Sequence, residues 1–267
     1  MVKFQPKEHY TMQDLVEIVS LLCDPQGGCP WDQEQTHQSI RMNFIEETYE
    51  VIDAIDQQDA HLLQEELGDV LLQVALHSQM EAEAGRFTFD EVCDGICKKL
   101  VYRHPHVFGE MGAVTSGEAL VNWELLKNKE KGRATAKDRL ESVPHSFPAL
   151  MRAAKLQKRA AAYGFDCENP QDALQTLKQQ IAQLESALQQ GQAVPPVGDV
   201  LFAATALCRS LKQDPEQALT QASDAFMQQV IRCEEMAASQ GTCLQDVSDE
   251  QRNEFWQQAK QEQSSKT

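Results

Sequence analysis

The sequence predicts an all-α fold made of two tandem copies of a small helical bundle. Apolar residues recur at helical spacing through most of the chain, with no strand-like alternation. The breaker-rich stretch D-P-Q-G-G-C-P-W at 24–31 is typical of a loop between helices. Two patterns of the first half also recur in the second half at a similar separation, which indicates a duplicated domain.

Length and charge limit the kinds of partner that the chain can have. Its 267 residues, 42% of them hydrophobic, suit one large domain or two small ones. The net charge of −17 argues against a nucleic-acid polymer as the main partner, but a single nucleotide can be neutralised by cations and a few bases. No apolar run approaches the roughly 20 residues of a membrane span, and the first ten residues lack the apolar segment of a signal peptide. The eight cysteines show no C-x-x-C spacing, so we expect reduced thiols in a cytoplasmic protein.

The first predicted helix runs from Met12 to Leu22 and carries its apolar residues on one face. After the loop at 24–31, Thr36 or Ser39 is expected to cap the next helix. Trp31 stands at this junction of loop and helix, where it is either a core side chain or part of a pocket.

Two acidic helices, predicted over 43–55 and 62–80, are the central feature of the sequence. Each carries two carboxylates three residues apart, which share a helix face. These residues are Glu47 and Glu50 in the first helix, and Glu66 and Asp69 in the second. Helices joined by a short link tend to pack antiparallel, so the two pairs are expected to meet in one cluster. Clustered carboxylates repel each other unless a cation lies among them, and hard oxygen ligands suit Mg²⁺ or Mn²⁺.

Glu-rich helices are more often simply solvent-exposed faces, but the second helix has another pattern. It is apolar almost all round and is therefore expected to be a core helix. Its polar residues form one narrow stripe, Glu66, Asp69, Gln73 and His77. The stripe is then either the only solvent-exposed edge of the helix or the lining of an internal site. Gly68 lowers helix propensity beside the stripe, which suggests close approach by a neighbour or a ligand.

A further helix is predicted over 89–100, followed by a short one over 118–127 with Trp123 facing inward. Lys98, Lys99 and Arg103 suit phosphate oxygens, but cations near a helix C-terminus are also favoured by the helix dipole, and both readings stay open. The basic stretch 127–139 has no apolar period and is predicted to be a mobile linker between domains.

The motifs E-E-T-Y-E at 46–50 and E-E-L-G-D at 65–69 resemble the E-E-x-x-E … E-x-x-D signature of the MazG family of all-α nucleoside triphosphate pyrophosphohydrolases. Four flanking motifs resemble this family too: G-G-C-P-W-D-Q-E-Q-T-H at 27–37, G-R-F-T-F at 85–89, R-H-P-H-V-F at 103–108 and N-W-E-L-L-K at 122–127. The resemblance covers nearly the whole chain. It implies a homodimer that uses Mg²⁺ to hydrolyse nucleoside triphosphates to monophosphate and pyrophosphate, with a role in nucleotide-pool housecleaning.

The resemblance also implies roles for individual residues. Glu47, Glu50, Glu66 and Asp69 would hold the metal, and Glu46 or one of these four would orient or deprotonate the attacking water. The expected substrate-binding residues are Asn43, Glu46, Lys99, Arg103, Trp123 and Trp31. Two alternatives stay open: a non-catalytic nucleotide- or metal-binding helical protein, and a related hydrolase with one specific substrate such as dCTP, dUTP or phosphoribosyl-ATP.

The second copy repeats the pattern of the first copy but has lost most of its acidic residues. V-G-D-V-L-F at 197–202 matches 67–72, and F-W-Q-Q-A-K at 255–260 matches 122–127. The places of Glu47, Glu50 and Glu66 are taken by Gln180, Gln183 and Pro196, and only Asp199 remains. An amide carries no charge and binds Mg²⁺ poorly. We therefore expect the working site in residues 1–135 and a structural, dimerising or regulatory role for residues 136–267.

Overall fold

The computed structural model describes residues 4–109, 112, 114–167 and 169–264, and within these ranges every regular element is a helix. The predicted all-α fold class is confirmed. The chain divides into two compact units, Met1–Lys127 and Asn128–Thr267. Within the described ranges, none of the helices combines the length and the hydropathy that a membrane crossing requires.

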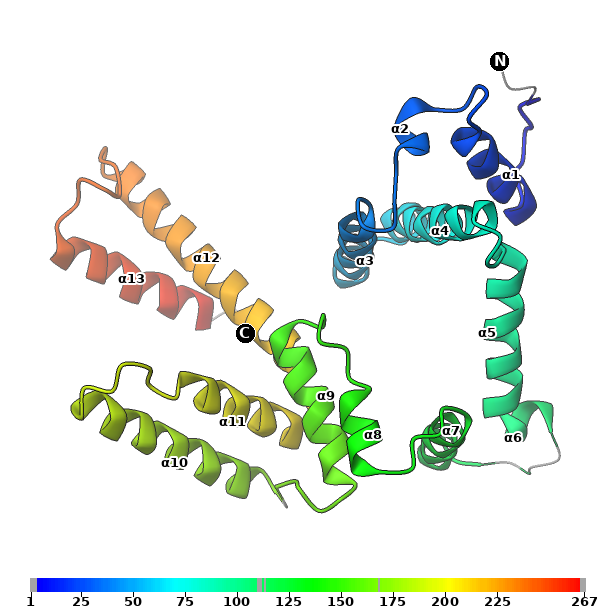
Figure 1. The fold of residues 1–267 in the computed structure, drawn as a ribbon. Helices are drawn as coiled ribbons and strands as arrows, with labels where there is room; N and C mark the ends of the chain where they lie inside the picture. The colour runs from blue at the N-terminus through cyan, green and yellow to red at the C-terminus, as the bar shows by residue number, and fades with distance from the viewer. Residues whose placement is uncertain (1–3, 110–111, 113, 168, 265–267) are drawn as a thin grey trace. The chain divides into compact units, whose positions relative to one another are not determined.

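The first unit contains α1 to α6 and most of α7 (Figure 1). Their bounds are α1 Met12–Cys23, α2 Pro30–Gln33, α3 Arg41–Asp56, α4 Ala60–Glu83, α5 Phe89–Arg103, α6 Pro105–Phe108 and α7 Ser116–Glu130. The core of this unit consists of Val19, Cys23, Ile40, Ala75, Leu76 and Phe89. α4 supplies Ala75 and Leu76 to this core and packs against both α1 and α3.

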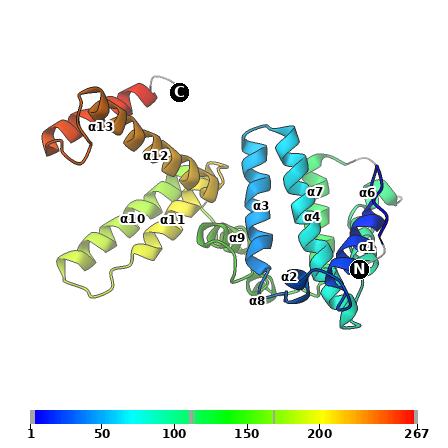
Figure 2. The ribbon, with the colours of Figure 1, turned by 90° about the horizontal axis from the view of Figure 1, so that it is seen from above.

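The α3–α4 hairpin positions the acidic residues (Figure 2). α3 ends where Gln58 adopts a left-handed conformation with φ 56°. Asp59 then begins α4, because its carboxylate accepts hydrogen bonds from the backbone N–H groups of His61 and Leu62. The short link turns the chain back, and Ala54 near the end of α3 is completely buried. The two helices therefore pack closely enough to bring their facing side chains together.

The expected helix cap is wrong, no neighbour lies close to Gly68 in the described part of the single chain, and the expected linker, in which the division between the two units falls, is partly helical. Thr36 and Ser39 do not cap α3, because each side chain binds the backbone N–H of the other in a preceding turn, at 3.2 and 2.9 Å. α3 begins instead after Ile40, which forms no side-chain cap. Gly68 has no close neighbour in the described part of the chain, since an added Cβ would meet nothing within 4 Å. The stretch 127–139 is partly helical, because α7 continues to Glu130 and α8 begins at Ala136.

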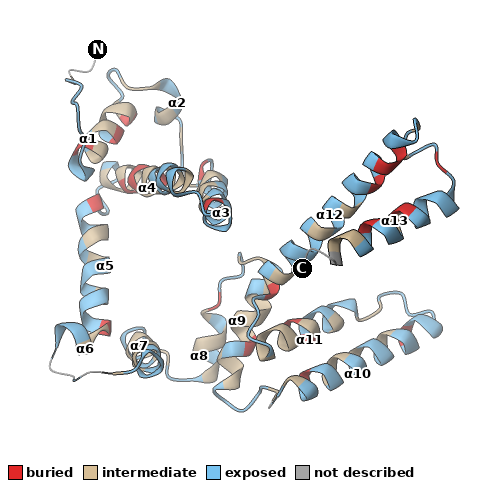
Figure 3. Cartoon of the chain, turned by 180° about the vertical axis from the view of Figure 1, so that it is seen from behind, coloured by how far each residue is buried: buried red, intermediate tan, exposed pale blue. Residues whose placement is uncertain are grey.

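The second unit repeats the packing order of the first unit. Its helices are α8 Ala136–Glu141, α9 Ala149–Ala161, α10 Pro170–Gln189, α11 Val197–Ser210, α12 Pro215–Ser239 and α13 Asp249–Ser264. α10 pairs with α11 as α3 pairs with α4, and α9 packs on α11 as α1 packs on α4. The second residue after the end of α10 is left-handed, as it is after α3: Gly191 has φ 65°. Figure 3 shows that buried residues in both units lie on the faces where helices pair, whereas much of α3 and α10 is exposed.

The start of α5 provides a stability test. Thr88 and Glu91 form a capping box, in which each side chain bonds the backbone N–H of the other residue. We expect Thr88→Ala to lower the free energy of unfolding by about 1 kcal/mol, measured by urea denaturation at fixed protein concentration. The matched control is Thr48→Ala, whose hydroxyl only bonds the Phe44 carbonyl inside α3 and which should change stability little. Equal losses in the two variants would contradict the capping role.

Candidate functional site

Three of the expected metal ligands lie together between α3 and α4. One carboxylate oxygen each of Glu47, Glu66 and Asp69 lies within 4.8 Å of the other two, and all three residues are half-buried. The i, i+3 spacing puts Glu66 and Asp69 on one face of α4, and the packing of α3 brings Glu47 opposite them. This spacing suits oxygen ligands around a single divalent cation.

Glu50 belongs to the same cluster. Hydrogen bonds with Glu50 help to raise the pKa values of Glu47 and Glu66. For both groups burial is the largest cause of the raised pKa, and the negative charges of Asp69 and Glu50 contribute as well. A divalent cation among the four residues would relieve this repulsion, so their arrangement fits such a cation.

The polar stripe of α4 continues from the carboxylates to a histidine network. His77 Nδ1 lies 2.7 Å from His37 Nδ1, and His37 Nε2 lies 2.6 Å from Glu81 Oε1. Arg86 donates to the same Glu81 at 2.7 Å, and its hydrogen bond is the largest cause that lowers the pKa of Glu81 to about 2. Burial, followed by His37, lowers the pKa of His77, which is therefore neutral at pH 7. The network fixes the His77 ring beside Phe44, with 5.9 Å between ring centres.

This network was not among the residues expected to form the site. The sequence placed His77 on the polar stripe but did not connect it to His37, which lies forty residues earlier. The available signal was His37 itself, the last residue of the motif at 27–37. A contact between residues so far apart depends on the path of the chain through α2, which periodicity does not give.

The expected phosphate-binding residues form a second group on α5 and α7. Arg103 is 9% exposed, and its guanidinium lies 5.3 Å from the centre of the Trp123 ring. Lys127 Nζ lies 4.3 Å from the same ring. Arg103 is the last residue of α5, which leads away from the end of α4 in Figure 1, so the single chain does not bring this group to the carboxylates. Lys99 is half-buried on α5.

The remaining expected site residues lie on α2 and α3. Asn43 is half-buried in the first turn of α3, one helical turn before Glu47. Glu46 is exposed beside the cluster. Trp31 is 55% exposed on the short helix α2, so it is not a core side chain of this unit.

The second unit offers no comparable cluster in its described residues. Glu47 lies eleven residues before the left-handed Gln58, and Gln180 lies eleven residues before the left-handed Gly191. The hairpin turns thus support the same correspondence as the sequence patterns. Pro196 stands immediately before α11, and Asp199 lies in its first turn.

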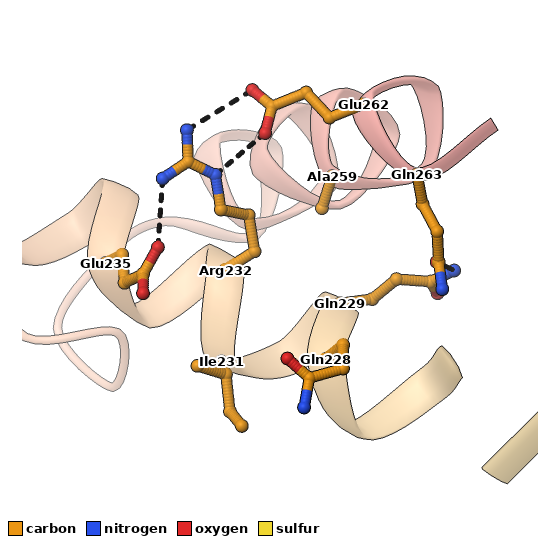
Figure 4. Close-up of a pocket in the computed structure, with 8 residues that line it drawn as sticks. All are labelled: Gln228, Gln229, Ile231, Arg232, Glu235, Ala259, Glu262 and Gln263. Atoms are coloured by element: carbon orange, nitrogen blue, oxygen red, sulfur yellow. Dashed lines mark hydrogen bonds and ion pairs between the residues drawn. The ribbon is translucent and has the colours of Figure 1, made fainter. Parts of the chain in front are cut away.

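A cavity of about 500 Å³ lies between α12 and α13 of the second unit (Figure 4). Its cation, Arg232, bonds Glu262 at 2.8 Å and Glu235 at 2.9 Å. Gln229 donates to Gln263 at 2.6 Å across the same cavity. Because Arg232 is already neutralised by two carboxylates, the cavity has no surplus positive charge to attract a triphosphate.

The fold and the carboxylate cluster define a class of helical protein with an acidic site between facing helices. Residues 35–108 match the MazG nucleotide pyrophosphohydrolase domain, which contains the whole cluster. The chain is 39% identical over 253 residues to the nucleoside triphosphate pyrophosphohydrolase of Escherichia coli K12, covering 93% of this chain and 96% of that protein. It is 37% identical over 248 residues to the nucleoside triphosphate pyrophosphohydrolase/pyrophosphatase MazG of Thermotoga maritima, covering 93% and 95%. The chain belongs to the MazG family.

The raised pKa values predict a distinct pH dependence. The folded protein holds protons on Glu47 and Glu66 more tightly than the unfolded chain does, so in EDTA their contribution to stability falls as pH rises above the ordinary Glu pKa of 4.5. We expect Glu47→Gln to leave the free energy of unfolding at pH 7 unchanged or higher, measured by urea denaturation in EDTA. Added Mg²⁺ should stabilise the wild type more than the variant.

Glu81→Gln is the control, because the opposite effect on stability at pH 7 is expected for it. The pKa of Glu81 is lowered to about 2, so its contribution to stability is present above pH 4.5 and is lost as pH falls toward 2. Glu81→Gln should therefore lower stability at pH 7. A similar loss of stability in Glu47→Gln and Glu81→Gln would contradict the assignment of a strained carboxylate cluster.

Proposed function

We propose that this chain is a divalent-metal-dependent nucleoside triphosphate pyrophosphohydrolase, which converts a nucleoside triphosphate and water into the monophosphate and pyrophosphate. The observation that carries the proposal is the cluster of Glu47, Glu66 and Asp69 between α3 and α4. The similarity to relatives bearing this activity in their names, over almost the whole of both chains, supports it.

The residues of the proposed site would have the following roles. Glu47, Glu50, Glu66 and Asp69 would hold Mg²⁺, with Mn²⁺ as the alternative of similar ligand preference. The bound ion supplies neutralising positive charge for the triphosphate and Lewis acidity. Exposed beside the cluster, Glu46 is one candidate to orient the attacking water and accept its proton, and the cluster carboxylates are the others. Asn43, one turn before Glu47 on α3, and Trp31, on the preceding helix α2, would contact the nucleotide.

A homodimer completes this proposal. The face of α3 opposite α4 exposes a stripe of apolar residues at helical spacing, and each of them is at least 43% exposed: Met42, Ile45, Tyr49, Ile52 and Ile55. Such a contiguous stripe is unusual on a monomer. A second copy of the chain would cover it and would bring Lys99, Arg103 and Trp123 to the phosphates and the nucleoside.

Two other functions remain as competitors. A protein that only binds nucleotide or metal would retain the cluster without turnover, and a related hydrolase would act on one substrate, such as dCTP, dUTP or phosphoribosyl-ATP. The discriminating experiment is a screen of common and modified nucleoside triphosphates with Mg²⁺, in which the products are resolved as monophosphate or diphosphate. Release of orthophosphate, or full activity in excess EDTA, would refute the proposed reaction.

The two hairpins offer a matched pair of substitutions. Asp69→Asn removes a ligand of the cluster, whereas Asp199→Asn changes the corresponding residue of α11, whose hairpin partners are amides. We expect Asp69→Asn to reduce kcat/KM at least about 100-fold, because even outer-shell changes cost 10- to 100-fold at metal sites. Asp199→Asn should remain within about twofold of wild type. The reverse outcome would place the working site in the second unit.

The dimer is tested on the apolar stripe. Ile52→Asp should shift the chain from dimer to monomer in size-exclusion chromatography with light scattering, because it puts a charge into an apolar interface. It should also reduce turnover, since Lys99 and Arg103 would then lack a partner's cluster. Gln64→Asp, at an exposed polar position of α4, is the control and should leave both properties unchanged. A wild-type monomer with full activity would exclude the shared site.

A further inference from the structure

Gln73 carries a buried side-chain carbonyl that has no hydrogen-bond partner in the part of the chain that the structure describes. It lies on α4 and is only 6% exposed. A buried acceptor without a donor is destabilising and is rare in folded proteins. This position therefore calls for a donor from outside the chain.

The neighbours of Gln73 define where such a donor would lie. Asp69 is one helical turn before it and His77 one turn after it, on the same polar stripe. Both neighbours face α3: Asp69 lies within 4.8 Å of Glu47, and the His77 ring packs against Phe44. Gln73 must therefore front the same interface, between the carboxylate cluster and the His77–Phe44 ring pair.

The second unit shows that the hairpin does not need this amide. Counting from the matching Gly68 and Gly198, the place of Gln73 is taken by Ala203 and the place of His77 by Leu207. Ala203 is also buried, at 5% exposed, and α11 packs on α10 in the usual way. The copy that lacks the metal carboxylates thus lacks the amide and the histidine as well. These losses together link Gln73 to the chemistry of the site and not to the packing of the hairpin.

We propose that Gln73 is a specificity-determining residue whose side-chain carbonyl accepts a hydrogen bond from a ribose hydroxyl of the bound nucleotide. The inference rests on the proposed function, because it takes the carboxylates to hold the triphosphate. The ribose follows the phosphates directly, so it falls one turn further along α4, at Gln73. The base then falls beside the His77 and Phe44 rings, which are tilted by 41° to each other, and an aromatic ring offers a base a face for stacking.

The test compares a nucleotide with its deoxy forms in two proteins. The probe is whichever of ATP, GTP, CTP and UTP the wild type handles best, with its 2′-deoxy and 3′-deoxy counterparts. Two quantities are measured: kcat/KM, and Kd for the corresponding α,β-methylene analogues with Mg²⁺. For the wild type we expect kcat/KM to fall, and Kd to rise, by about tenfold with one deoxy form, because a site that binds a substrate hydroxyl rejects the analogue that lacks it. Gln73→Met has a side chain of similar size but lacks the acceptor. In this variant the values for the parent nucleotide and for that deoxy form should agree to within about twofold.

Controls separate this inference from the proposed reaction. Gln79→Met, on the same helix but with its amide bonded to Glu83, should keep the wild-type preference. If the wild type hydrolyses nucleotides but shows no hydroxyl preference, or if Gln73→Met retains it, the role of Gln73 is refuted while the reaction stands. If the wild type binds with a Gln73-dependent preference but does not hydrolyse, the reaction is refuted and the role of Gln73 stands. A wild type that neither binds nor hydrolyses refutes both.

Stability supplies an independent readout. Because Gln73→Met replaces the buried unpartnered carbonyl of Gln73 with an apolar group in a side chain of similar volume, it should leave urea stability unchanged or raised. A loss of stability together with an unchanged hydroxyl preference would mean that Gln73 serves the fold, and would overturn the proposal.

Discussion

The close packing of α3 against α4 imposes the constraint on which the rest of the site depends. It buries Ala54 completely and brings the carboxylates of Glu47, Glu66 and Asp69 within 4.8 Å of one another. Burial and mutual repulsion both disfavour the charged forms, as the raised pKa values of Glu47 and Glu66 show. The same hairpin in the second unit forms with Gln180 in place of Glu47 and Pro196 in place of Glu66, so the fold does not require these charges. Their energetic cost is offset only when a cation is bound.

Much of the scaffold could be predicted from the sequence, because helical periodicity and i, i+3 spacing are local properties. They gave the helices that became α1, α3, α4 and α5, and they placed Glu66 and Asp69 on one face of α4. Periodicity states which residues share a face, but not what covers that face. Ile45, Tyr49 and Ile52 of α3, for example, are apolar and recur at helical spacing, yet they are exposed in the single chain.

The parts that could not be predicted depend on contacts distant in sequence or on choices between local hydrogen bonds. Thr36 and Ser39 have the right chemistry for a helix cap, but a competing turn uses both hydroxyls first. The pairing of His37 with His77 and Glu81 joins residues about forty positions apart. The burial of Gln73 is equally non-local, because its carbonyl loses access to water only when other helices pack over α4. Polar groups of this kind are visible in a sequence only as exceptions to an apolar pattern.

The stripe along α4 shows why recognition and catalysis are expected to share one helix. A cation among carboxylates attracts any triphosphate, so the cluster by itself cannot distinguish one nucleotide from another. Discrimination needs neutral groups that lose a hydrogen bond when the wrong ligand binds, and these must lie at a fixed distance from the charges. Successive turns of a single rigid helix meet this requirement, since Asp69, Gln73 and His77 keep their spacing without help from loops. The histidine network holds the far end of the stripe, because Arg86 and Glu81 orient His37 against a neutral His77.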